Sequence, residues 1–94
     1  MPRRDTNSVD AQERAQELGL RALVWVLTEP DRALRFMDLT GLTPAALRAG
    51  AGDPAVLSAT LAFLESHEPD LMACAAAIDV PPAALVAANE SLSA

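Results

Sequence analysis

The only histidine of the chain, His67, stands between Ser66 and Glu68, so three residue types used in nucleophilic catalysis occur in a row. A serine–histidine–acid arrangement works only when its three side chains converge in space. Consecutive side chains on a helix do not face one another, and this run falls near a predicted helix end. The pattern therefore predicts a surface histidine favoured by the helix dipole.

Cys74 is the only cysteine and lies among alanines, so an internal disulfide is excluded. A reactive thiolate needs a nearby cation or a helix N-terminus, and no basic residue is close in sequence. We expect Cys74 to be a small buried core residue. One cysteine and one histidine also cannot supply the four such ligands of a structural zinc site.

The residues that other kinds of catalysis require are also missing from the sequence. The glycines do not follow the order of a phosphate-binding loop, and the absence of lysine removes both a Schiff base and a phosphate-loop lysine. The acidic residues at predicted helix boundaries are better explained by capping and the helix dipole. These are Asp31, Asp38, Asp70 and Asp79. We therefore expect no enzyme activity, no cofactor and no metal.

Residues 34–48 are similar to the helix-turn-helix of DNA-binding proteins, with Thr-Gly-Leu-Thr as the turn. A recognition helix presents polar side chains to base edges, but the second helix here offers only Arg48. Arg32 and Arg35 would add phosphate contacts. The net charge of −6 argues against non-specific nucleic-acid binding. Nucleic-acid binding through this hairpin is the alternative hypothesis, and plain helix packing is the main one.

Trp25, the only tryptophan, has two open interpretations. It is either an anchor of the hydrophobic core or an exposed anchor for a partner, because tryptophan is enriched in interface hot spots. Together with Arg32, Arg35 and Arg48 it forms the set of candidate partner contacts.

The composition indicates which elements position these residues. With 94 residues, 51% hydrophobic and 3% aromatic, and with alanine abundant, the chain predicts one all-α domain. We expect a compact bundle of five to six helices over residues 9–94 and a disordered tail over residues 1–8. The tail has no apolar stretch typical of a signal peptide, and the run Leu18–Leu27 is too short to span a membrane. We expect a cytoplasmic protein.

Prolines mark the predicted starts of five helices after the first one, since proline suits the first helical position. They are Pro30, Pro44, Pro54, Pro69 and Pro82. The first helix is expected over about residues 10–28, with Asp10 as its cap and the ion pairs Asp10–Arg14 and Glu17–Arg21 along it. Gly41 and Asp79 are predicted to end helices in the left-handed conformation.

Hydrophobic spacing predicts which faces are buried. Beyond Leu18 the first helix is apolar on most faces, which indicates the centre of the bundle. Three residues of the second helix, Leu34, Phe36 and Met37, are expected to face inward. Leu57, Leu61 and Leu64 form a seam on the fourth helix, and Leu85 and Leu92 face the core from the last one.

The chain also contains a weak internal repeat. Trp25–Ala49 and Phe63–Ala87 both run from an aromatic residue through Glu-Pro-Asp to Pro-Ala-Ala-Leu. A repeat of this period is typical of a repeated helical unit, and we expect the two units to pack through the first and fourth helices.

The block Glu29–Phe36, the Thr-Gly-Leu-Thr-Pro element ending at Pro44, and Asp53-Pro54 together resemble a family of short bacterial proteins defined as a domain of unknown function. The resemblance covers roughly residues 15–90. It implies an all-helical fold and brings no activity, cofactor or catalytic residue. The leading hypothesis is a small non-enzymatic interaction or regulatory module that binds an unknown protein partner or a second copy, and no membrane.

Overall fold

The computed structural model describes the backbone of residues 2–93 and the side chains of residues 9–93. Within that part of the chain it contains six α-helices and no strand, so the predicted all-α bundle is confirmed. The helices are α1 (Pro2–Leu27), α2 (Pro30–Thr40), α3 (Pro44–Gly50), α4 (Pro54–Glu65), α5 (Glu68–Ala77) and α6 (Pro82–Ser93).

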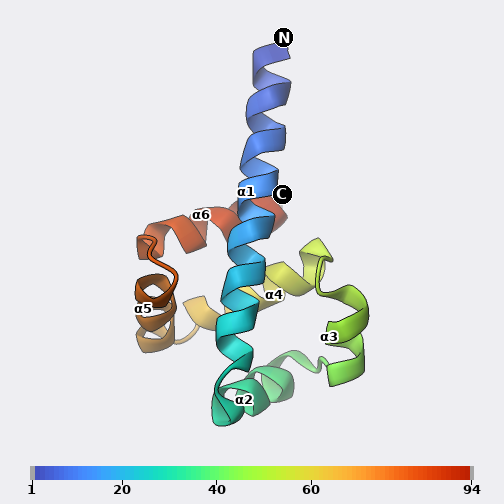
Figure 1. The fold of residues 1–94 in the computed structure, drawn as a ribbon, viewed down its shortest axis with the longest axis vertical. Helices are drawn as coiled ribbons and strands as arrows, with labels where there is room; N and C mark the ends of the chain where they lie inside the picture. Colours follow the sequence, from blue (N-terminus) through green and yellow to red (C-terminus); the bar gives the residue numbers. More distant parts are fainter. Residues whose placement is uncertain (1, 94) are drawn as a thin grey trace.

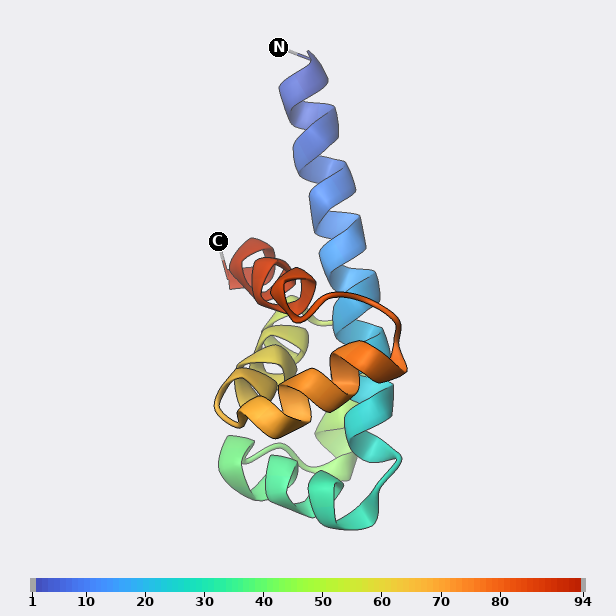
Figure 2. The same ribbon diagram turned by 90° about the vertical axis from the view of Figure 1, so that its left-hand side faces the viewer.

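The long helix α1 runs along the longest of the molecule's dimensions, which are 46 × 27 × 17 Å. It crosses in front of α4 and α6 in Figure 1 and forms one edge of the body in Figure 2. The N-terminal half of α1 extends beyond the other helices in both views. Its most extensive contacts are with α6 and α4, so these three helices form the centre of the fold.

One hydrophobic core contains side chains from all six helices. The predicted seam of α4 is fully buried, and Leu85 and Leu92 face the core from α6 as expected. Phe36 of α2 packs edge to face on Phe63 of α4, with ring centroids 5.3 Å apart. Because these aromatic residues belong to different repeat units, the core joins the two units.

The predicted packing of α1 on α4 is confirmed, and Gly19 makes it close. A Cβ added at Gly19 would lie 3.0 Å from the Cβ of Leu57 on α4. Real Cβ atoms essentially never approach more closely, so any larger residue at position 19 would push against Leu57. This close approach at Gly19 was not predicted from the sequence.

The predicted boundary residues cap their helices. The Thr43 hydroxyl accepts a hydrogen bond from the Ala46 amide, and the Asp53 carboxylate accepts one from the Ala55 amide. Gly41 and Asp79 have φ values of 76° and 60°. The corresponding helix end in each repeat unit therefore adopts the predicted left-handed conformation. The prolines stand in the first turns as expected.

The expected start of the first helix is wrong. The sequence predicts that this helix is capped at Asp10, whereas α1 already begins at Pro2. No glycine or proline lies between Arg3 and Leu18, so no residue interrupts the helix there. Asp10 therefore lies in the helix interior. The side chains of residues 1–8 lie outside the described residues.

The prediction for α2 is partly wrong. Phe36 is buried and Met37 is half-buried, but Leu34 is 58% exposed. Ala33, one residue earlier, takes the inward position. The small alanine lets α2 lie close to the body, and Leu34 is then left on the solvent side.

Candidate functional site

Arg32 holds the end of α1. Its guanidinium donates hydrogen bonds to the carbonyl oxygens of Val26 and Trp25 and to the Thr28 hydroxyl. It also stacks on the Trp25 ring, 3.5 Å from the ring centroid. The last carbonyls of a helix lack partners within the helix, and a cation is favoured there. Arg32 therefore has a structural role that the sequence did not predict.

Arg35 joins the two repeat units. Its guanidinium forms an ion pair with Asp70 of α5 and lies 5.6 Å from the centroid of the Phe63 ring. The side chain is still 47% exposed, so the pair is a surface contact of modest energy.

Arg48 differs from these two arginines. It is exposed in the last turn of α3 and forms no hydrogen bond or ion pair with any described side chain. Of the three arginines proposed as phosphate contacts, two are therefore already occupied by partners within the fold. The hairpin of α2 and α3 is present, but its arginines do not form a free basic surface.

The run at His67 shows no catalytic arrangement. His67 is exposed at the N-cap of α5, where its side chain makes no capping hydrogen bond. The Ser66 hydroxyl donates to the carbonyl oxygen of Phe63, away from the histidine. His67 is thus a surface residue, as predicted. It lies in the short connection between α4 and α5.

Cys74 is fully buried in the core, as predicted. Burial raises the pKa of its thiol from 9.0 to about 11, with Arg32 lowering the pKa and Asp70 raising it to smaller extents. The thiol is therefore protonated at neutral pH.

The outward face of α1 is the main departure from prediction. The sequence places the second half of this helix at the centre of the bundle, but only one side of it is covered. Leu20, Val24 and Leu27 are 39%, 63% and 39% exposed, and their spacing of four and three residues puts them on one face. We call these three residues the apolar stripe. The second half of α1 carries apolar residues on two opposite sides. Within the described chain, the other helices bury only one of these sides.

A groove lies beside this stripe, between α1 and the end of α5. It has a volume of about 350 Å³ and shares Val24 with the stripe. Its lining residues are Arg21, Val24, Trp25, Thr28, Ala77 and Ile78. The half-buried Trp25 thus packs against the core and also lines the groove. It therefore has features of both a core anchor and an exposed residue.

Arg21 connects the two sides of the groove. Its guanidinium donates a 2.8 Å hydrogen bond to the carbonyl oxygen of Ile78, at the end of α5. The predicted ion pair with Glu17 is absent from the described side chains, because Arg21 turns towards α5 instead. Glu17 therefore remains an exposed carboxylate one turn before the groove.

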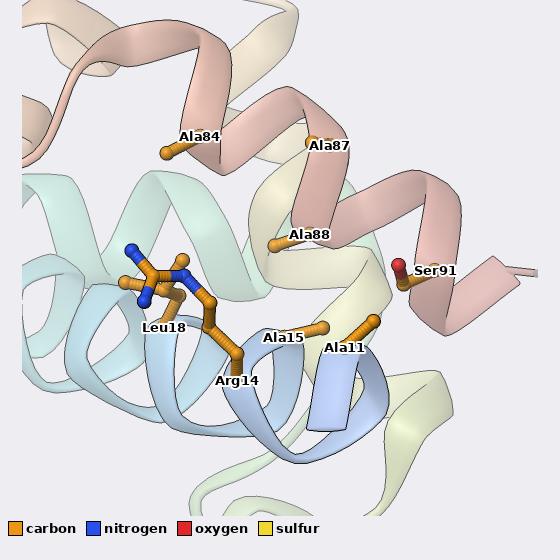
Figure 3. A pocket seen from close by; sticks show the side chains of 8 residues that line it. All are labelled: Ala11, Arg14, Ala15, Leu18, Ala84, Ala87, Ala88 and Ser91. Atoms are coloured by element: carbon orange, nitrogen blue, oxygen red, sulfur yellow. The ribbon is translucent and has the colours of Figure 1, made fainter. Parts of the chain in front are cut away.

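A second hollow, of about 160 Å³, lies between α1 and α6. Figure 3 shows Ala11, Ala15 and Leu18 of α1 facing Ala88 and Ser91 of α6, with the Arg14 side chain beside them. The walls are mainly alanine methyl groups and offer few polar atoms. Small side chains explain the close approach of the two helices, and Arg14 and Ser91 supply the polar atoms of the hollow.

No three His, Cys, Asp or Glu side chains among residues 9–93 are grouped so that they could hold a metal ion. No single helix in the described chain is long and apolar enough to cross a membrane. Only α5 and α6 taken together reach that length and apolarity, and they are bent by 101° relative to each other.

The helices and this apolar surface define a small all-α protein with a partly uncovered long helix. A family model described as "Protein of unknown function (DUF3572)" matches residues 12–94, and the chain belongs to this family. The predicted resemblance to a domain of unknown function is thereby confirmed. No curated protein and no solved structure matches the chain.

Proposed function

We propose that this protein is a small non-enzymatic interaction module that binds a protein partner through the outward face of α1. The observation that supports this most directly is the exposure of Val24, at 63%, in the middle of the apolar stripe. Isolated exposed apolar residues are common, but a contiguous apolar face beside a groove is typical of binding sites. The proposed compartment is the cytoplasm, where a free thiol such as Cys74 stays reduced.

The position of Trp25 adds support. Hot spots in protein interfaces are often tryptophan side chains, and they lie in partly preformed pockets. Arg32 stacks on this ring and holds it in place, so little side-chain entropy remains to be lost on binding. Arg32 thus contributes to the proposed binding face by holding the Trp25 ring in position.

Nucleic-acid binding through residues 34–48 receives less support. Arg32 and Arg35 are held by carbonyl groups and by Asp70, so phosphate contact would require breaking these interactions. Arg48 alone neutralises too little phosphate charge to offset a net charge of −6.

Photo-crosslinking tests the proposed face. A photoreactive amino acid at Val24 should give a discrete adduct in a lysate of the source organism, while the same group at Leu39 of α2 should not. Leu39 is a matched control because it is 68% exposed and does not line the groove. A serine substitution at Leu20 should abolish the adduct if the stripe forms the contact. Equal labelling from both positions, or none from Val24, would contradict the proposal.

A further inference from the structure

We propose that the occupant of this face is an amphipathic helix of a partner protein that carries apolar residues flanked by lysine or arginine. This inference rests on the proposed function and specifies the chemistry of its partner. It depends on the shape of the groove, on the apolar stripe, and on the charges around both.

The shape suits a helix. The groove runs between α1 and the end of α5, and Val24 connects it to the stripe, so the two form one continuous apolar surface. The apolar surface follows α1 from Leu20 to Thr28, for about 12 Å at a rise of 1.5 Å per residue, and with Glu13 and Glu17 before it this face of the helix extends for about 22 Å. A helix of about four turns has the same length and binds such surfaces with residues spaced three and four apart.

The charges around the surface are mainly negative. Glu13 and Glu17 stand on the same side of α1, two turns and one turn before the stripe respectively, and both are exposed. Asp79 follows the lining residue Ile78, and Asp31 lies in the first turn of α2, beyond the other end of the stripe. Carboxylates therefore lie at both ends of the apolar surface.

Two arginines at the same surface offset only part of this charge, since four carboxylates stand against two guanidinium groups. Arg21 donates to the carbonyl oxygen of Ile78, and Arg32 donates to the carbonyl oxygens that end α1. Both guanidinium groups keep their positive charge, because carbonyl oxygens are neutral, and the excess of two carboxylates leaves the surface negative. A partner with basic residues on both sides of an apolar stripe would complement this potential and associate faster through it.

A second copy of the chain complements the surface less well. Glu17 precedes Val24 by seven residues and Asp31 follows it by seven. An antiparallel twofold pairing centred on Val24 would therefore place carboxylates of the two copies at the same ends of the interface. Like charges there would oppose dimerisation, and the net charge of −6 adds to this repulsion.

Trp25 provides the measurement. It lines the groove, and the chain has no other tryptophan and no tyrosine, so its emission reports on this site alone. The probe is a 15-residue amphipathic peptide of leucine and lysine, and the comparison peptide replaces every lysine by glutamate. The leucine–lysine peptide should shift the emission and saturate, with an affinity that falls as salt rises, while the leucine–glutamate peptide should not bind.

Two variants test the two parts of the surface. Val24→Ser should weaken peptide binding at least tenfold, because it removes the most exposed residue of the apolar stripe. The double variant Glu13→Gln/Glu17→Gln should weaken binding about three- to tenfold and reduce its salt dependence. Leu39→Ser and Glu90→Gln are the matched controls, and both should bind as the unaltered protein does.

The outcomes separate this inference from the proposed function. Equal binding of both peptides, or no binding of either, overturns the basic-helix assignment. The Val24 crosslinking result then decides whether the face still binds a protein of different chemistry. If light scattering shows a dimer that is lost in Val24→Ser, the occupant of the face is a second copy of the chain and not a basic helix.

Discussion

At the scale of single residues, buried Cys74 is the group whose ionisation is coupled to folding. Its pKa rises from 9.0 to about 11 because burial disfavours the thiolate. The unfolded chain therefore ionises this thiol at a lower pH than the folded chain does. The corresponding stability is fully present below pH 9 and is lost as the pH rises towards 11.

We expect the free energy of unfolding to fall by on the order of 2–3 kcal/mol between pH 9 and 11, as measured by urea unfolding. The chain contains no lysine and no tyrosine, so no other described side chain ordinarily titrates in this interval. Cys74→Ala should abolish the slope even if it lowers the stability at pH 7. A slope that persists in that variant would contradict this account.

The arginines show how residue type alone can mislead. Arg32, Arg35 and Arg48 have the same chemistry in the sequence, but only Arg48 lacks a partner among the described side chains. The difference lies in placement: Arg32 reaches the unpaired carbonyls that end α1, and Arg35 reaches Asp70 of α5.

At the scale of elements, both repeat units end α2 and α5 at a left-handed residue, but the residues and the hydrogen bonds that close the turns differ. Gly41 donates its amide to the carbonyl oxygen of Met37, and after Asp79 the Val80 amide donates to the carbonyl oxygen of Ala75. Both end residues have positive φ. The left-handed conformation costs a residue with a Cβ about 1–2 kcal/mol, and somewhat less for aspartate.

Exchanging the two residues tests the equivalence of the caps. Asp79→Gly should stabilise the protein by up to about 1 kcal/mol, and Gly41→Asp should destabilise it by about 1 kcal/mol. Thermal unfolding followed by circular dichroism measures both changes. Opposite signs are expected, and a loss of stability in Asp79→Gly would show that the aspartate side chain stabilises its turn.

The contact of α1 with α4 is a second test at this scale. Gly19→Val should destabilise the protein by about 1–3 kcal/mol, because the added Cβ would lie 3.0 Å from the Cβ of Leu57 and the helices would have to separate. Gly52→Val is the control, since nothing lies within 4 Å of a Cβ added there. Urea unfolding of both variants should show a loss only at Gly19.

At the scale of the whole molecule, the two repeat units share one core. Phe36 of the first unit packs on Phe63 of the second, and α6 packs on both α1 and α4. Neither unit can bury its apolar residues without the other. The repeat therefore describes a pattern in the sequence, while stability belongs to the complete bundle.

A core substitution in the second unit should consequently unfold both units together. Leu85→Ala in α6 should cost about 2–5 kcal/mol, because the side chain is fully buried. The emission of Trp25, in the first unit, should change at the same denaturant concentration as the helical signal of the whole chain. Separate midpoints would show that the units unfold independently.

The sequence by itself determined the helices and most of their ends. Proline, Gly41, Thr43 and Asp53 act through the local backbone, so their effects can be predicted from neighbouring residues. The burial of Cys74 and of the α4 seam also followed from local composition and spacing.

Only the tertiary structure decided how these helices cover one another. The apolar second half of α1 was expected inside the bundle, but the remaining helices cover one side of it and leave Val24 exposed. The roles of Arg21 and Arg32 also required the fold, since their carbonyl partners are placed by helix packing and chain reversal. Hydrophobicity along a helix indicates how much surface could be buried, whereas the arrangement of its neighbours determines which face remains for a partner.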